Sequence, residues 1–269
     1  MARTSIHRLI DVLALTLALL GLGCASAVMA SAVTERARLK TSFSPDRLGA
    51  STTIGFSFEV STSEGAAPPP LTAVDLYMPA QMNYGQTTLG LAICQPAVLL
   101  AQGPSGCSPN SRLGYGSAFV EVPFGTGSGH ELPEIQALMG PPIDGNMDVL
   151  FYANGQTPVS AQLVFVGEVL PATGVFGSQL STAVPAIPSV PNGPDVSIVR
   201  VQATIGPSHL TYYKHRHGKR VPFHPIGIGV PERCPTGGFP FTAQFTFQDG
   251  SHATASDTVP CPPARHKHH

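Results

Sequence analysis

The sequence predicts an all-β fold: an antiparallel β-sandwich, immunoglobulin-like or jelly-roll-like, built as one large domain or as two stacked β modules. Apolar and polar residues alternate with a period of two in several segments, which is typical of half-buried strands. Helical periodicity is scarce after residue 32, and the 28 glycines and 27 prolines supply many turns. A hydrophobic share of 42% argues against a disordered chain.

Residues 1–32 have the pattern of a secretory signal peptide. Arg3 and Arg8 form a basic start, Leu9–Leu22 is an apolar run, and small residues with two A-x-A cleavage sites follow. We favour cleavage at the second site, because the mature chain then begins with a polar segment. Two alternatives stay open, a lipid on Cys24 and an uncleaved membrane anchor. The pattern predicts a secreted or envelope-associated protein.

The expected β domain covers residues 33–262. Alternation predicts strands in three segments of its first half: Ser51–Val60, Val74–Met78 and Arg112–Val122. The segment Cys94–Cys107 is expected to be a loop or a short helix, and Leu132–Met139 is the best helix candidate. If there are two modules, their boundary is expected near residues 123–146, a loop rich in glycine and proline.

The second half opens with the clearest local unit, residues 147–169. Its two β-rich runs surround Asn154-Gly155, a pair that tolerates the positive φ angles of a tight hairpin turn. Leu170–Pro194 is rich in proline and small residues and is expected to be a crossing segment, after which Val196–Ile205 is a strand.

The last hairpin is predicted at Phe239–Val259, with Asp249-Gly250 in its turn. The cysteines that follow the signal are Cys94, Cys107, Cys234 and Cys261, and an even number in an exported chain predicts disulfides. Three connectivities exist. Local pairing is the simplest, because Cys234 and Cys261 lie near the open ends of this hairpin. No C-x-x-C pair is present, so a cysteine zinc site is not predicted.

Two motifs carry a resemblance to known proteins. The stretches "CQPAVLLAQGPSGCSPNSRLGYGSA" and "CPTGGFPFTAQFTFQDGSHATASDTVPCP" resemble uncharacterised secreted proteins of soil actinobacteria with GC-rich genomes, over about Leu71 to Pro262. The resemblance implies export and a β fold. It implies no catalytic residue, because no activity is established for those proteins.

The stretch "TYYKHRHGKR" at Thr211–Arg220 concentrates positive charge in a chain of formal net charge −1. His217-Gly218 is expected to form a hairpin turn. The candidate binding residues for an anionic partner are Tyr212, Tyr213, Lys214, His215, Arg216, Lys219 and Arg220. The expected partner is an anionic cell-envelope polymer or another surface protein. Nucleic acid is not expected, because the whole molecule has no strong positive field. The alternative is a solvated hairpin whose charges protect an exposed edge.

The same stretch raises the question of a metal site. His215 and His217 could share one strand face, with His209 or His224 as a third ligand. The neighbouring basic residues oppose a bound cation, and no carboxylate lies nearby in sequence to orient the imidazoles. We therefore predict no metal and no cofactor. The His-rich tail, residues 263–269, is expected to be disordered.

Catalytic patterns are weak. Ser128, His130 and Glu131 could be imagined as a hydrolase triad, but neighbours in a glycine-rich loop rarely hold that geometry. The acidic residues of the middle of the chain are scattered. The leading hypothesis is an exported, non-enzymatic protein that makes surface contacts. The alternatives are a secreted hydrolase whose site is assembled only in three dimensions, and a histidine-based metal-handling protein.

Overall fold

The computed structural model describes residues 34–158 and 160–262. The predicted signal peptide, Cys24 and the His-rich tail lie outside the described residues. The strands are β1 (Glu35–Ser44), β2 (Ser51–Thr62), β3 (Leu71–Pro79), β4 (Arg112–Phe124), β5 (Gly127–Glu131), β6 (Glu134–Met139), β7 (Met147–Gly155), β8 (Ala161–Pro171), β9 (Phe176–Ala183), β10 (Ser197–Ile205), β11 (Tyr212–Arg216), β12 (Lys219–Phe223), β13 (Ile228–Gly229), β14 (Phe239–Phe247) and β15 (His252–Val259). The helices are α2 (Pro96–Gln102) and the 3-10 turns η1 (Gly103–Gly106) and η2 (Pro109–Ser111). Within the described ranges, no helix is long and apolar enough to cross a membrane.

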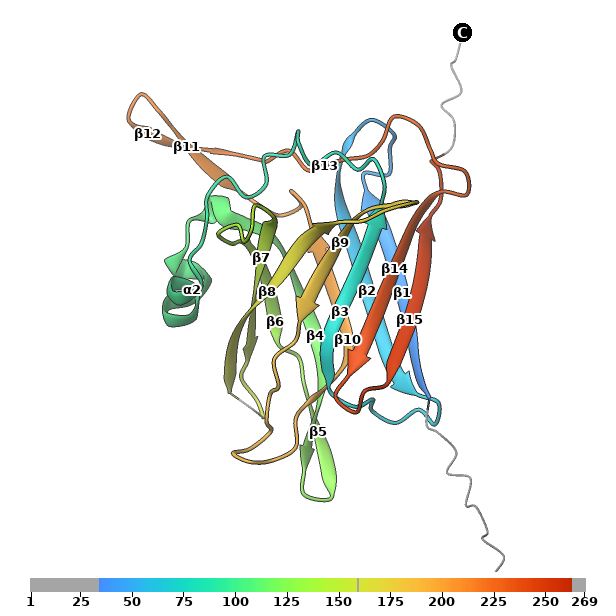
Figure 1. Cartoon of the computed structure of the whole chain (residues 1–269). Helices are drawn as coiled ribbons and strands as arrows, with labels where there is room; N and C mark the ends of the chain where they lie inside the picture. Colours follow the sequence, from blue (N-terminus) through green and yellow to red (C-terminus); the bar gives the residue numbers. More distant parts are fainter. Residues whose placement is uncertain (1–33, 159, 263–269) are drawn as a thin grey trace, which may run out of the picture. The chain divides into compact units, whose positions relative to one another are not determined.

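One antiparallel sheet organises the described chain (Figure 1). Its order is β1-β2-β10-β4-β6-β7-β8-β9-β3-β14-β15, with β13 added to β2 and β5 added to β4. The path of 11 strands is nearly closed. The backbone N–H and the hydroxyl of Thr41 on β1 both donate to the Asp257 carboxylate on β15, at 2.6 and 2.9 Å, so the two end strands meet. The predicted all-β antiparallel class is confirmed.

The core lies inside this sheet, on the face that the alternating apolar residues share. On β14, Phe239, Phe241, Phe245 and Phe247 are each at most 1% exposed. The ring of Phe58 on β2 lies 5.0 Å from the ring of Phe245, measured between centroids. Strands far apart in the sheet order therefore pack their inward faces against each other.

A smaller cluster covers the outer face of the sheet. Helix α2 packs Leu99, which is fully buried, against Leu138 on β6 and Leu150 on β7. The disulfide between Cys94 and Cys107 closes this segment. The second disulfide joins Cys234 to Cys261, so the local pairing is confirmed. Of the two expectations for the segment between Cys94 and Cys107, a loop or a short helix, the structure shows the short helix.

Three sequence predictions about single elements are wrong. Leu132–Met139 is not a helix: β6 pairs with β4 on one side and β7 on the other, and these backbone partners outweigh a weak local helix preference. Asn154 and Gly155 pair with Gln162 and Ala161 inside the β7–β8 ladder, so the hairpin exists but its turn comes later. The supposed crossing segment contains β9, which bridges β8 and β3.

Candidate functional site

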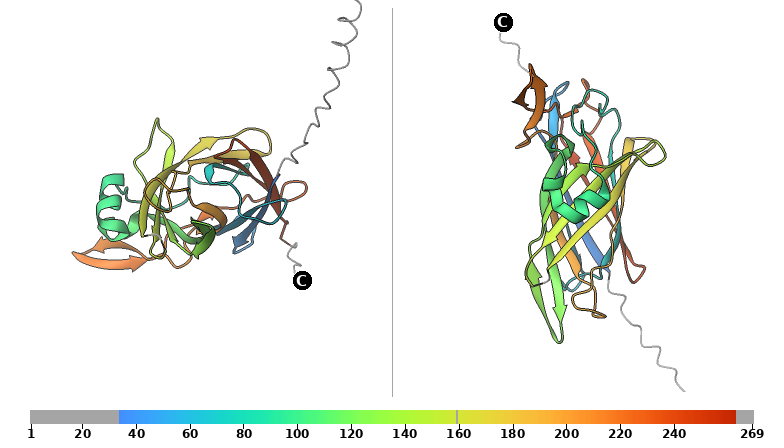
Figure 2. Two further views of the ribbon diagram at one scale, coloured as in Figure 1. Left: turned by 90° about the horizontal axis from the view of Figure 1, so that it is seen from below. Right: turned by 90° about the vertical axis from the view of Figure 1, so that its left-hand side faces the viewer.

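The basic stretch forms a hairpin of its own, strands β11 and β12, which we call the arm. Its register runs from Tyr212 opposite Phe223 to Arg216 opposite Lys219. His217 and Gly218 have φ angles of 49° and 76°, as a tight turn with two left-handed residues requires. Figures 1 and 2 show the arm projecting away from the large sheet. The predicted hairpin turn is confirmed.

The base of the arm is anchored by hydrogen bonds to the first residue of β4 and to the segment before it. Tyr212 is 0% exposed; its hydroxyl donates to the Arg112 carbonyl and accepts from the Gly90 N–H at 2.9 Å. Burial raises the pKa of Tyr212, so this hydroxyl stays a neutral donor. The Asn110 side chain accepts from the Tyr213 N–H and donates to the Tyr213 carbonyl, both at 2.8 Å. Tyr212 therefore belongs to the anchor and offers no surface to a ligand.

The remaining predicted contact residues lie on the arm beyond Tyr212, from Tyr213 near the base to Arg216 and Lys219 beside the turn. The Arg220 guanidinium carbon lies 3.6 Å from the centroid of the Tyr213 ring, and the Lys214 ammonium lies 5.2 Å from that of Phe223. Such cation–π contacts hold the cations in place while leaving their N–H groups available. His215, Arg216 and Lys219 are exposed. Arg216 and Lys219 are opposite each other in the ladder, and Lys214 shares their face of the hairpin. Arg220 is opposite His215 and lies on the other face. One short hairpin therefore carries all four arm cations, Lys214, Arg216, Lys219 and Arg220, on its two faces.

These cations have no acidic partner in the described part of the chain. Over residues 34–158 and 160–262, one pair of oppositely ionisable side chains comes within ion-pair distance, His130 with Glu121 at 4.0 Å. The positive charge of the arm is therefore not neutralised by a neighbouring carboxylate there.

The histidines considered as metal ligands are not brought together. His217 lies in the turn, beyond the end of β11. His209 packs edge-on against Tyr115, with the rings 5.9 Å apart, and the Nδ1 atom of His224 lies 3.0 Å from the Leu210 carbonyl oxygen. Among the residues that the structure describes, no group of three or more His, Cys, Asp or Glu side chains could hold a metal ion.

The imagined hydrolase triad is not assembled either. Ser128 and His130 share one face of β5, whereas Glu131 points to the other face because successive strand residues alternate. The His130 ring stacks on Phe119 at 5.0 Å. Glu131 is 8% exposed and accepts a hydrogen bond from the Thr157 N–H at 3.1 Å. These three side chains cannot share a proton.

Comparisons of the chain with protein-family models, curated proteins and solved structures found no match. No activity, ligand or partner is therefore transferred from another protein. The geometry of this chain alone carries the functional argument, and the resemblance to secreted actinobacterial proteins stays a prediction from its motifs.

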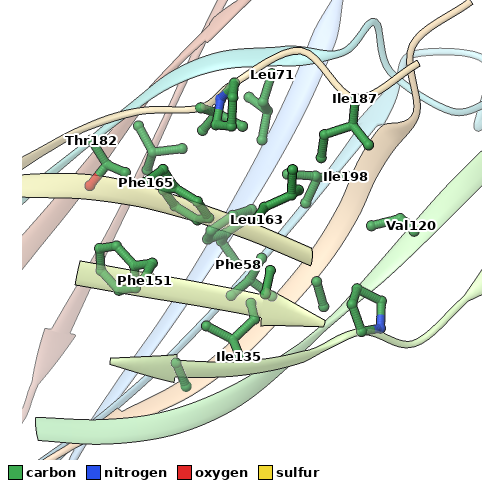
Figure 3. Close-up of a pocket in the computed structure, with 18 of the residues that line it drawn as sticks. Phe58, Leu71, Val120, Ile135, Phe151, Leu163, Phe165, Thr182, Ile187 and Ile198 are labelled. Atoms are coloured by element: carbon green, nitrogen blue, oxygen red, sulfur yellow. The ribbon is translucent and has the colours of Figure 1, made fainter. Parts of the chain in front are cut away.

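The structure also contains a feature that sequence reasoning missed, a cavity of about 150 Å³ inside the sheet (Figure 3). Phe58, Phe151, Leu163 and Ile198 point into it from four different strands. A second cavity of about 80 Å³ shares four lining residues with the first, Phe56, Leu76, Phe151 and Leu180, so the two are adjacent. The alternation predicts which side chains of a strand share a face. The volume left between those side chains depends on how strands on opposite sides of the interior pack against each other.

Proposed function

We propose that this chain is an exported, non-enzymatic protein that contacts an anionic polymer of the cell envelope through the tip of its arm. The observation that carries the proposal is the set of four arm cations on one anchored projection, with no carboxylate partner in the described ranges. Unpaired positive charge attracts polyanions over about 8 Å at physiological ionic strength.

The anchoring of the arm supports a binding role. A contact surface that is already ordered loses less conformational entropy when a partner binds. The Asn110 side chain holds the backbone of Tyr213, and the Tyr213 ring in turn supports Arg220. The arm thus presents its charges from a defined position.

The expected location agrees with this proposal. Two disulfides fit an oxidising, extracellular environment, where such bonds form and persist. The signal-like pattern of residues 1–32 is what an exported chain would carry. A polymer of the envelope, rich in phosphate or carboxylate, is an anionic partner that an exported protein meets.

The test compares two variants with the same loss of charge. The arm variant carries Lys214→Ala, Arg216→Ala, Lys219→Ala and Arg220→Ala. The control carries Arg36→Ala, Arg38→Ala, Lys40→Ala and Arg200→Ala, which removes as many exposed cations from β1 and β10. Binding of inorganic polyphosphate is measured by calorimetry as salt is raised, and cosedimentation with purified envelope from the source cells follows.

We expect salt-sensitive binding that the arm variant loses by about tenfold or more, since each basic residue near an anionic surface contributes about 1 kcal/mol. The control should keep most of its affinity. Equal losses in the two variants would mean that only net charge matters. No binding by the unmodified chain would mean that the arm is a solvated hairpin, and either result would overturn the proposal.

A further inference from the structure

The inward face of the sheet is not packed to the density of an ordinary core. Leu39, Ile135, Phe165 and Leu180 all face the interior, yet each remains half-buried, and all four line the larger cavity. Protein interiors rarely contain voids much larger than one water molecule. A void of about 150 Å³ is large enough to admit a benzene ring in a known engineered case.

The chemistry of the lining selects against water. Among the described residues that line the larger cavity, the polar side chains are Glu131 and Thr182, and all others are apolar. A buried water needs two to four polar partners, and apolar cavities of this size stay dry or take apolar ligands. The lining therefore suits hydrocarbon.

The larger cavity comes close to solvent at the loop between β9 and β10. Pro185 in this loop lines the cavity and is also exposed, so we take this end of the cavity as its mouth. In that loop the Val196 N–H donates to the Ile187 carbonyl at 2.9 Å, and the Ile187 side chain lies against the cavity (Figure 3). The loop is tied to the turn after β14, because the Gln248 amide donates to Asp195 at 2.8 Å.

Glu131 makes this end of the cavity polar, whereas the rest of the lining is mostly apolar. It is opposite Val120 in the β4–β5 ladder, and Val120 lines the cavity with Ile187 and Val196. The opposite end meets the smaller cavity, whose described lining side chains carry no charge. A carboxylate near the mouth accepts hydrogen bonds and repels another carboxylate.

We propose that the interior binds a single short hydrocarbon chain that enters at the β9–β10 loop and whose polar end donates a hydrogen bond to Glu131. The hydrocarbon ligand fills the larger cavity first, and the end of its apolar tail approaches the smaller cavity. The ligand class is a short-chain alcohol or amine rather than a fatty acid. This site is separate from the arm, so neither proposal depends on the other.

The first experiment measures binding of hexanol, heptanol and octanol to the mature protein by calorimetry. Each added methylene should raise affinity by about fourfold until the two cavities are filled. Octanoate should bind more weakly than octanol. In Glu131→Gln the preference for octanol over octanoate should disappear, because the amide carries no charge.

The decisive variant fills the cavity. Ala153 on β7 lines it, so Ala153→Phe should abolish alcohol binding. The matched control is Ala183→Phe, an exposed position on β9 that should bind as the unmodified chain does. If Ala153→Phe fails to fold, Leu163→Ala replaces it: the enlarged cavity should extend the rise in affinity to longer alcohols.

Three results would overturn the proposal. These are no alcohol binding by the unmodified protein, undiminished binding by a folded Ala153→Phe, or an unchanged chain-length profile in Leu163→Ala. Loss of polyphosphate binding in the arm variant with intact alcohol binding would separate the two sites.

Discussion

Neighbouring residues of this chain meet very different environments. Tyr212 is fully buried and anchors the arm, whereas Tyr213 supports an exposed arginine. The sequence predicts both as contact residues, because adjacent tyrosines in a basic stretch look alike. Their difference comes from Gly90, Asn110 and Arg112, which lie about a hundred positions earlier and which no local pattern connects to the arm.

Asp148 is a buried carboxyl group whose ionisation is costly. It is 1% exposed, its Oδ1 atom has no hydrogen-bond partner, and it faces Glu168 across the β7–β8 ladder. Burial raises the pKa of Asp148, and the charges of Glu168 and Asp144 raise it further. Between the ordinary pKa of aspartate and this raised one, the folded state therefore binds more protons at Asp148 than the unfolded chain does.

The raised pKa of Asp148 makes the stability of the fold depend on pH, and proton linkage gives the sign of that dependence. Where the folded state binds more protons than the unfolded state, the free energy of unfolding falls as pH rises, from the ordinary pKa of aspartate through the raised one. Asp148→Asn removes this penalty and should raise the urea midpoint at neutral pH while flattening its decline with pH. Asp46→Asn, at an exposed position, is the control. A steeper decline in Asp148→Asn would contradict this account.

At the scale of elements, alternation and turn residues predict a hairpin best when its two strands are adjacent in sequence and both signals are clear. The β14–β15 hairpin is predicted fully, because its alternation and its Asp249-Gly250 turn are both local. Local patterns did not predict β6 and β9 as strands. Each of these strands pairs with one strand next to it in sequence and with a second that is further away, β4 for β6 and β3 for β9. Neither segment shows the clear alternation or turn pair that marks the last hairpin.

The arm offers a test of how one element is held. Asn110→Ala removes both hydrogen bonds to the backbone of Tyr213 and should cost about 1 kcal/mol locally, because partly buried backbone groups lose their partner. Amide hydrogen exchange at Tyr213 should accelerate while Phe245 in β14 stays protected. Asn110→Asp keeps the acceptor and should fall between the two. Equal exchange in all three proteins would show that Asn110 does not anchor the arm.

At the scale of the whole molecule, the two end strands of the nearly closed sheet meet through side-chain hydrogen bonds. β1 and β15 come from opposite ends of the described chain, and Asp257 joins them by accepting two hydrogen bonds from Thr41. The Asp257 side chain thus links two strands that, unlike the other neighbours in the sheet, are not joined by a backbone ladder. Strands from both halves of the sheet order, such as β2 and β8, line the interior cavity from different sides.

Asp257→Ala tests the closure. It leaves the Thr41 N–H without its partner and should lower the free energy of unfolding by about 1–3 kcal/mol, which corresponds to about 2–4 °C of Tm per kcal/mol in a domain of this size. Ser256→Ala, whose hydroxyl meets Thr242 on the exposed face, should change stability by less than about 0.5 kcal/mol. Calorimetric melting curves check both. Equal Tm values in the two variants would exclude a closing role for Asp257.

The sequence by itself predicted the class of fold, the alternating faces of β2, β3 and β14, the local cysteine pairing as the simplest of three connectivities, and the basic arm with its turn. Each depends on neighbours within a few tens of residues, through alternation, turn chemistry or a short cysteine loop. Only the tertiary structure decided the strand order, the burial of Tyr212, the tie between Thr41 and Asp257, and the cavity beside Glu131. These features depend on contacts between segments that are distant in sequence. The alternation of apolar and polar residues predicts which face of a strand a side chain occupies, but it does not predict which residues of other strands the side chain contacts.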